Sequence, residues 1–355
     1  MRTKFSFLLI FFFIVPLALA ELKPGFYSTS CSKAESIVFN VVQRRFSTDK
    51  TIPGGLLRMF FHDCFAGSAG CDAAILIDST DANPSEKDAS PNLTVRGYEI
   101  IDEAKQELEK VCPSTVSCAD IIALATRDAV VLAGGPNFTV STGRLDGLRS
   151  NPEVVDLPGP TVPVSEVLQR FANKGFTPKE AVALLGAHTV GFSRCSFFQE
   201  RLSNFRATGV ADNDMDQSFA EDLSRTCGSS SSEDPTTFLD HGTPNAFDNQ
   251  YYNQTMFKRG VLKIDQALAT DTSTAGFVSH FASDQADFQV TFSNGMVKLG
   301  GLGVLDNSAG EVRQNCRAFN RPSTQPPNKG RGQKPKDNKG RKQLSFPFNM
   351  FQNGN

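Results

Sequence analysis

The sequence predicts a mainly α-helical protein with few or no strands. Apolar residues recur three and four positions apart in most segments, whereas the alternation typical of a strand is scarce. A third observation is the helix-start signal Thr177-Pro178-Lys179-Glu180, which combines an N-cap, a proline in the first turn and a capping-box glutamate. At 355 residues, the chain is long enough for one large domain or two fused halves around a sizeable core.

Four helices are expected in the first half of the chain, each from an apolar stripe at helical spacing. They cover residues 32–46, a segment around Arg58 and His62, residues 98–111, and residues 117–132. Pro53-Gly54-Gly55 is expected to separate the first two helices, because proline and glycine interrupt helices. Residues 21–30 are expected to be extended and residues 64–88 to form a loop.

Five helices are expected in the second half. They begin near Ser165 and at Thr177, and lie around residues 219–223, 247–257 and 277–281. The helix that begins at Thr177 is expected to carry His188 near its end. No internal repeat is present.

Residues 1–20 have the pattern of a secretory signal peptide. Arg2 and Lys4 precede an apolar run, and Ala18-Leu19-Ala20 is a small-residue cleavage site. The run is too short to span a bilayer, and no later stretch is long and apolar enough, so we expect export and no membrane span. In an oxidising compartment the eight cysteines favour disulfides over a thiolate metal site, but their spacing leaves 105 pairings open. Three sequons, at Asn92, Asn137 and Asn253, are compatible with a glycoprotein.

The formal net charge of −2 conceals two regions of opposite charge. Residues 321–355 carry a net charge of +7, which with the basic start of the chain leaves −11 on residues 21–320. The tail 321–355 is rich in Pro, Gly, Gln, Asn and Lys, a composition that predicts disorder. Two functional alternatives are a removable sorting propeptide, which would direct the protein to the vacuole, and an arm that binds anionic wall polysaccharide. No nucleic-acid partner is expected.

Two histidine segments are the candidate functional residues. Arg58 and His62 are four residues apart and therefore project from the same face of a helix that is apolar enough to be buried. A buried guanidinium beside an imidazole is costly unless both groups have partners or a chemical role. An isolated pair of this kind is more often a satisfied core histidine with a surface arginine, so the pair needs support from elsewhere. That support comes from the second segment, Leu184-Leu185-Gly186-Ala187-His188-Thr189-Val190-Gly191.

Together, this segment and residues 56–65 resemble the proximal and distal histidine motifs of the secreted plant-type (class III) haem peroxidases. The resemblance spans about residues 22–319 and includes Gly143-Arg144-Leu145-Asp146. It implies a monomeric plant-type haem peroxidase fold in residues 21–320, with two helical halves enclosing haem b. It also implies an extracellular or cell-wall enzyme that reduces hydrogen peroxide to water while oxidising small, typically phenolic, donors in one-electron steps.

On the proximal side, the resemblance makes His188 the axial ligand of the haem iron. Asp265, in Ile264-Asp265-Gln266 where the family has S-D-Q, would accept a hydrogen bond from the other ring nitrogen and raise the ligand's basicity. Pro158 and Phe197 would meet the donor at the haem edge.

On the distal side, the resemblance makes His62 the acid–base group and Arg58 the cation that stabilises negative charge as the O–O bond breaks. Asn92 would set the tautomer of His62, and Phe61 would contact the haem. If Asn92 lies inside the protein, its sequon cannot be glycosylated.

Two calcium sites with oxygen ligands are implied as well. The proximal set matches fully: Thr189, Asp240, Thr243, the carbonyl of Ala246, and Asp248. The distal set matches at Asp63, Gly70 and Asp72, with Glu86 linking the neighbouring loop. Ala74 replaces the usual serine ligand, and two extra residues lie around Gly67-Ser68-Ala69, so the distal site is expected to be weaker, rearranged or absent.

The resemblance also implies the disulfide pairs Cys31–Cys112, Cys64–Cys71, Cys118–Cys316 and Cys195–Cys227. Three further departures are Phe138 for the usual Trp, Leu145 for Arg and Leu185 for Ser. Two other functions remain open from the sequence. One is a non-enzymatic extracellular protein that binds anionic polymers, and the other is a haem protein that produces or consumes reactive oxygen species without a phenolic donor.

Overall fold

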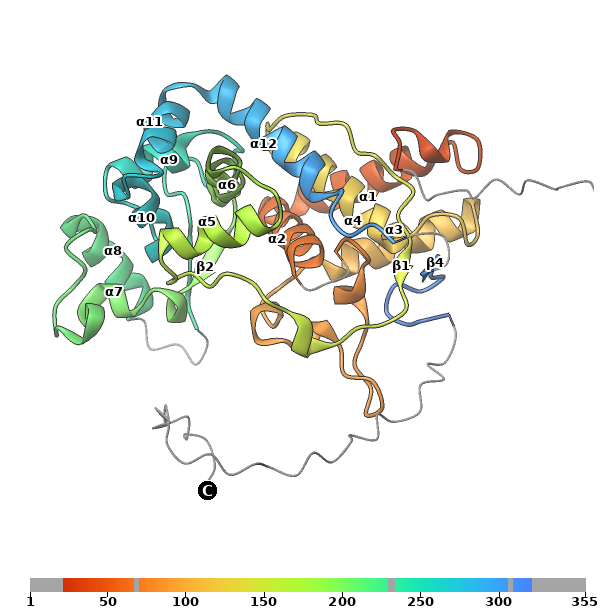
Figure 1. Cartoon of the computed structure of the whole chain (residues 1–355), viewed down its shortest axis with the longest axis horizontal. Coiled ribbons are helices and arrows are strands. Elements are labelled where there is room, and N and C mark those ends of the chain that lie inside the picture. Colours follow the sequence, from red (N-terminus) through yellow and green to blue (C-terminus); the bar gives the residue numbers. More distant parts are fainter. Residues whose placement is uncertain (1–21, 67–69, 229–233, 306–308, 321–355) are drawn as a thin grey trace, which may run out of the picture. The chain divides into compact units, whose positions relative to one another are not determined.

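The computed structural model describes residues 22–66, 70–228, 234–305 and 309–320. The expected signal peptide, the inserted residues 67–69 and the basic tail 321–355 lie outside the described residues. Within the described part of the chain there are twelve α-helices and four strands of two or three residues, so the prediction of a mainly α protein is confirmed (Figure 1). None of these helices is long and apolar enough to cross a membrane.

The helices of the first half pack around α4. The bounds are α1 Ala34–Thr48, α2 Ile52–Phe65, α3 Tyr98–Val111 and α4 Cys118–Leu132. Helices α1, α2 and α3 each contact α4, most of whose residues are buried, as its apolar character on most sides predicts (Figure 1). This group forms one helical half of the fold.

The second group follows β1 (Asp146–Gly147) and is joined to the first by a long final helix. Its helices are α5 Val164–Asn173, α6 Pro178–Leu185, α7 Glu200–Ser203, α8 Gln217–Cys227, α9 Gln250–Met256, α10 Lys263–Thr270, α11 Ala275–Ser283 and α12 Gln285–Leu299. Helices α9, α10 and α11 pack on one another, and α12 contacts both α6 and α2. Strand β2 (Phe192–Arg194) pairs antiparallel with β3 (Thr236–Phe238), and β1 pairs antiparallel with β4 (Gly310–Glu311).

The boundary between the first two helices differs from the prediction. Helix α2 begins at Ile52, so Pro53, Gly54 and Gly55 lie inside its first turn and do not precede it. A proline is tolerated there because the amides of the first turn have no partner within the helix. The chain instead breaks at Asp49, whose carboxylate accepts hydrogen bonds from the amide and the hydroxyl of Thr51.

The position of His188 also differs. The capping box at Thr177 and Glu180 is present as predicted, but α6 ends at Leu185, and His188 lies on a 3₁₀ turn, Gly186–Thr189. The chain must leave the helix here because Gly191, at φ +98°, turns it into β2. The imidazole is therefore placed by this turn and not by the helix.

Other differences are local. Short 3₁₀ turns occur at Phe26–Ser28, Ala74–Leu76 and Glu86–Asp88, where extended chain or loop was expected. The helix expected over residues 247–257 spans Gln250–Met256. Helices α7, α10 and α12 were not predicted.

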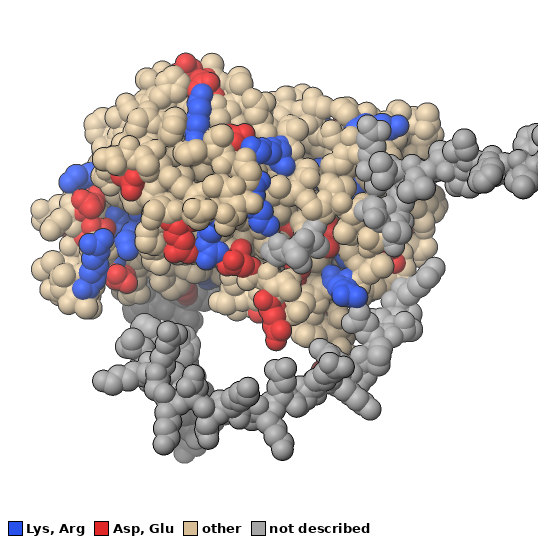
Figure 2. Space-filling view, in the orientation of Figure 1, with Lys and Arg blue, Asp and Glu red and all other residues tan. Residues whose placement is uncertain are grey.

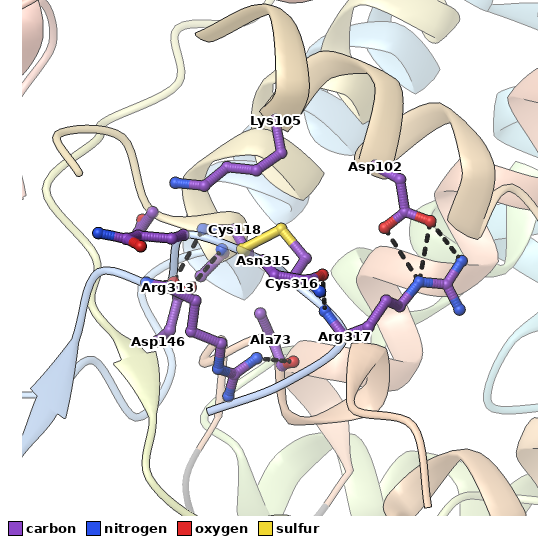
Figure 3. The surroundings of a disulfide bond; sticks show 12 residues. Ala73, Asp102, Lys105, Cys118, Asp146, Arg313, Asn315, Cys316 and Arg317 are labelled. Carbon is purple, nitrogen blue, oxygen red and sulfur yellow. Dashed lines mark hydrogen bonds and ion pairs between the residues drawn. A yellow bond between two sulfur atoms is a disulfide. The ribbon is translucent and has the colours of Figure 1, made fainter. Parts of the chain in front are cut away.

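All eight cysteines are paired as the resemblance implies: Cys31–Cys112, Cys64–Cys71, Cys118–Cys316 and Cys195–Cys227. The Cys118–Cys316 bridge joins the start of α4 to the C-terminal segment 309–320 (Figure 3). Next to it, the buried guanidinium of Arg313 donates to the carbonyls of Ala73 and Gly147, 2.8 and 2.7 Å away. The C-terminal segment is thus fixed to the first half of the fold.

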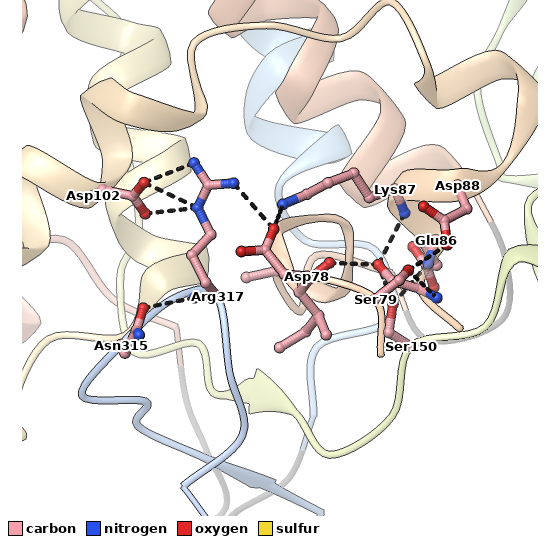
Figure 4. Close-up of polar contacts among 12 residues, drawn as sticks. Asp78, Ser79, Glu86, Lys87, Asp88, Asp102, Ser150, Asn315 and Arg317 are labelled. Carbon is pink, nitrogen blue, oxygen red and sulfur yellow. Dashed lines mark hydrogen bonds and ion pairs between the residues drawn. The ribbon is translucent and has the colours of Figure 1, made fainter. Parts of the chain in front are cut away.

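A surface network extends this attachment toward residues 78–88. The guanidinium of Arg317 contacts both carboxylate oxygens of Asp102 on α3 and reaches Asp78, which also pairs with Lys87 (Figure 4). Elsewhere on the face in Figure 2, acidic and basic side chains of the described residues lie interspersed, so the net negative charge is not gathered into one patch there. The network holds the loop that contains Glu86 and leads to Asn92.

Two glycines bring the first turn of α2 close to the turn after His188. A Cβ atom on Gly54, in the first turn of α2, would lie 2.6 Å from the Cα atom of Gly191. Because Arg58 and His62 follow Gly54 at intervals of four residues, the α2 face that carries them is the one pressed against the turn after His188. The Gly54–Gly191 contact therefore sets the separation of the two histidine segments.

Substituting Gly54→Ala is expected to lower the free energy of unfolding by about 1–3 kcal/mol, because the added methyl group meets backbone atoms that cannot move aside. Gly276→Ala, on α11, is the matched control, since no atom lies within 4 Å of its added methyl group and alanine favours a helix over glycine. Urea titrations of the two variants test the prediction. Equal stability of Gly54→Ala and the wild type would contradict it.

Candidate active site

Helix α2 places Arg58 and His62 on the face that looks toward the second half. The Nε of Arg58 donates to the Nε2 of His62 at 3.3 Å. The two terminal nitrogens of the guanidinium donate to the carbonyls of Thr94 and Pro91, at 3.3 and 3.0 Å. The loop that follows Glu86 therefore fixes the arginine beside the histidine.

The hydrogen bonds of His62 determine which of its nitrogens carries the proton. The side-chain amide of Asn92 donates to the carbonyl of Glu86 at 2.7 Å, so its oxygen points to the Nδ1 of His62, 2.6 Å away. Since an amide oxygen only accepts, Nδ1 carries the hydrogen and Nε2 presents its lone pair. Asn92 is 2% exposed, and both the oxygen and the nitrogen of its side-chain amide are hydrogen-bonded. This excludes glycosylation of its sequon in the folded protein.

Burial and the adjacent charge of Arg58 lower the pKa of His62 to about 3, although the hydrogen bond with Asn92 opposes this. The imidazole is therefore neutral at physiological pH, as a proton acceptor must be. Burial also lowers the pKa of Arg58, but the guanidinium remains charged.

On the other side, α10 carries the partner of His188. The Nδ1 of His188 donates to the Oδ1 of Asp265 at 2.8 Å, and Asp265 is 1% exposed. Burial lowers the pKa of His188, but the Asp265 carboxylate overcomes this effect, and the pKa lies above its ordinary value. The Nε2 of His188 has no hydrogen-bond partner among the described residues and is thus available as a ligand atom.

Three residues expected to contact a haem retain exposed surface in the part of the chain that the structure describes. The side chain of His188 is 30% exposed, so its ring can be reached by a ligand. Arg58 and Phe61, the other α2 residues expected at a haem, are half-buried among fully buried neighbours. Phe61 stacks on Phe65, at 4.7 Å between ring centroids, which anchors it in the core.

The proximal calcium residues are brought together as expected. The hydroxyl of Thr189 lies 3.3 Å from carboxylate oxygens of both Asp240 and Asp248 and 3.5 Å from the carbonyl of Ala246. The hydroxyl of Thr243 contacts the same two carboxylates. Five oxygen donors thus surround one point, a donor set that suits calcium.

Asp63, one of the residues expected in the distal calcium set, lies in the core. Asp63 is 2% exposed, and neither of its carboxylate oxygens has a hydrogen-bond partner among the described residues. Burial and the carboxylates of Asp72 and Glu86 raise the pKa of Asp63 well above its usual range, and Glu86 itself, buried next to Asp72, has a pKa of about 8. A buried carboxylate without partners is a binding position for a cation. Gly70, of the distal set, has a φ of +84°, whereas the residues 67–69 before it lie outside the described residues.

No three His, Cys, Asp or Glu side chains of the described residues are grouped closely enough to hold a metal by themselves. Both calcium sites would therefore depend on hydroxyl, carbonyl or water oxygens as well. The absence of a side-chain oxygen at Ala74, which is buried, leaves the distal set with one donor fewer than the family pattern.

The two residues expected to contact the electron-donating substrate are accessible, but no contact within the described residues brings them together. Phe197 is 39% exposed at the end of a 3₁₀ turn, and Pro158 is half-buried in the segment before α5. Sequence reasoning missed Tyr251, whose hydroxyl also donates to Asp265. It lies on the helix expected over residues 247–257, but nothing in the pattern indicates its partner.

Comparisons with known proteins identify the family of this chain. The model of the peroxidase family matches residues 38–284. Peroxidase 44 of Arabidopsis thaliana is 52% identical over 321 residues, which are 90% of this chain and 100% of that protein. Peroxidase 57 of the same plant is 51% identical over 89% of this chain and 98% of its own length. Peroxidase 5 of Vitis vinifera is 44% identical over 85% of this chain and 92% of its own length. The chain therefore belongs to the plant-type peroxidase family and is itself a peroxidase.

Proposed function

We propose that this peroxidase is a secreted haem b enzyme that reduces hydrogen peroxide with electrons taken one at a time from small phenolic donors. The observation that carries the proposal is the contrast between the hydrogen bonds of its two imidazoles. His62 is neutral and unprotonated at Nε2, which accepts a hydrogen bond from Arg58, whereas His188 is anchored through Nδ1 to Asp265 and offers Nε2 to a metal.

Each residue has a distinct role in this proposal. Haem, when bound through His188, supplies the iron centre at which peroxide is cleaved. His62 takes a proton from peroxide at Nε2 and returns it to the departing oxygen, which leaves as water. Arg58, fixed by the carbonyls of Thr94 and Pro91, stabilises the negative charge that develops on that oxygen. Asn92 keeps Nε2 unprotonated between turnovers.

The Asp265 carboxylate has two roles on the proximal side. It fixes the orientation of the His188 ring, and its hydrogen bond at 2.8 Å increases electron density on the nitrogen that binds iron. Donors would be oxidised at the haem edge near Pro158 and Phe197. The four disulfides support export, because such bonds persist in oxidising compartments. The basic tail is proposed to bind anionic wall polysaccharide or to act as a sorting signal.

The purified holoprotein tests this function directly. We expect a Soret band and peroxide-dependent oxidation of guaiacol, measured by absorbance. A colourless protein that binds anionic polymers in a salt-sensitive manner would contradict the proposal. A haem protein that consumes peroxide at the same rate with and without any phenol in a donor screen would contradict the choice of donor alone.

Removing calcium is expected to lower the melting temperature. A ligand present at 100 times its dissociation constant contributes about 2.7 kcal/mol, which for a domain of about 300 residues corresponds to about 4 °C. Differential scanning calorimetry with excess calcium and with a chelator measures the change. Asp248→Asn, which weakens the proximal oxygen set, is expected to reduce the calcium-dependent shift, and an unchanged melting temperature on chelation would contradict the calcium assignment.

A further inference from the structure

One oxygen of Asp265 accepts two hydrogen bonds. The Nδ1 of His188 donates to Oδ1 at 2.8 Å, and the hydroxyl of Tyr251 donates to the same atom at 2.8 Å. The three residues come from three elements: the 3₁₀ turn after α6, helix α10 and helix α9. Asp265 and Tyr251 are buried, so little water competes for this oxygen.

We propose that Tyr251 is a positioning residue that tunes the proximal ligand by competing with His188 for Oδ1 of Asp265. The proposal rests on the assignment of His188 as the axial ligand. It adds a second hydrogen-bond donor to the His188–Asp265 pair. It also predicts in which direction that donor changes the ferric/ferrous equilibrium of a bound iron.

The direction follows from the sharing of one oxygen. A hydroxyl that donates to a carboxylate stabilises the negative charge, and the bond is strong because the acceptor is charged and buried. The carboxylate then attracts the Nδ1 proton of His188 less. With less imidazolate character, the ring donates less electron density through Nε2, so the ferrous state of a bound iron becomes easier to reach.

The phenol is suited to this role because it remains a donor. A phenolic hydroxyl carries its proton at neutral pH, and the 2.8 Å contact with the Asp265 carboxylate uses that proton. Its ring also packs edge-on against the imidazole of His188, with centroids 6.1 Å apart. Phenylalanine would keep this packing and remove only the hydroxyl.

The adjacent Tyr252 provides a matched control. It is equally buried and lies on the same helix, but its hydroxyl donates to the carbonyl of Val182 at 3.1 Å and not to Asp265. Tyr252→Phe therefore removes a buried hydroxyl from the same core without altering the acceptor shared by His188 and Tyr251.

The experiment compares the haem-loaded wild type with Tyr251→Phe, Tyr252→Phe and Asp265→Asn. Spectroelectrochemical titration measures the ferric/ferrous equilibrium, and resonance Raman spectroscopy of the ferrous protein measures the iron–histidine stretch. In Tyr251→Phe we expect the ferric/ferrous equilibrium constant to change three- to tenfold in favour of the ferric state. This corresponds to a reduction potential lower by at most about 59 mV. We also expect a higher frequency of the iron–histidine stretch. Asp265→Asn should shift both quantities the opposite way, and Tyr252→Phe should match the wild type.

Two outcomes would overturn the proposal. In the first, Tyr251→Phe matches the wild type while Asp265→Asn is shifted, which leaves the ligand assignment intact. In the second, Tyr251→Phe and Tyr252→Phe shift equally, which indicates a packing effect. Failure of the ligand assignment itself looks different, because the wild type would then lack an iron–histidine band and His188→Ala would leave the haem spectrum unchanged.

Discussion

Replacing His62 with alanine is expected to lower kcat/KM for hydrogen peroxide by about 10²- to 10⁴-fold, the range that a positioned acid–base group contributes. The imidazole is the group whose Nε2 lone pair faces the site, and no second histidine among the described residues lies on the same face of α2. Because haem retention is assigned to His188, the Soret band should persist. Stopped-flow absorbance at varied peroxide concentration measures the change.

The exposed histidine His280 provides the control for this substitution. It pairs with Asp287 at the surface, and its side chain is 49% exposed. His280→Ala should therefore retain full turnover. If His62→Ala turned over at the wild-type rate with its haem bound, the acid–base assignment would be wrong.

Replacing Arg58 with leucine is expected to have the second largest effect, of about 10²- to 10³-fold in kcat, by analogy with the loss of one preorganised oxyanion donor. The pH profile should change as well. Wild-type kcat/KM for peroxide should remain level through mildly acidic pH and fall only as the pH approaches about 3, where His62 gains a proton. Without the neighbouring cation the pKa of His62 rises, so this acid limb moves to higher pH.

The same pKa has a consequence for stability. In the unfolded chain a histidine binds a proton below about 6.5, whereas folded His62 remains neutral down to about 3. The unfolded state therefore binds more protons in this window, and the contribution of His62 makes folding less favourable as the pH falls from about 6.5 to 3. In Arg58→Leu the pH range over which His62 lowers stability is narrower, because the pKa of folded His62 lies closer to that of an unfolded histidine.

Arg58→Lys separates charge from geometry. Lysine retains the positive charge but cannot donate in the forked pattern that reaches both Thr94 and Pro91. In Arg58→Lys, the acid limb of the pH profile of kcat/KM for peroxide should stay close to that of the wild type, while kcat falls. An acid limb that is identical in Arg58→Leu and the wild type would show that Arg58 does not lower the pKa of His62.

Local signals predicted the start of α6 but failed where distant contacts decided the backbone, and they left α7, α10 and α12 unpredicted. Thr177 and Glu180 form their capping box from residues three apart, and α6 begins as predicted. By contrast, Gly54 could be read as a helix breaker because its role, contact with Gly191, involves a residue far along the chain.

The sequence by itself determined the helical class, the shared face of Arg58 and His62, and, through its likeness to a family, the disulfide pairs. The roles of the two histidines stay a prediction from the same likeness. Only the tertiary structure decided the tautomer and low pKa of His62, the burial that excludes glycosylation at Asn92, and the second donor to Asp265. These properties depend on contacts between residues 30 and 14 positions apart in the chain, as for His62–Asn92 and Tyr251–Asp265. Helical periodicity describes which side of a segment is buried, but the partner that meets that side is selected by packing among all the segments.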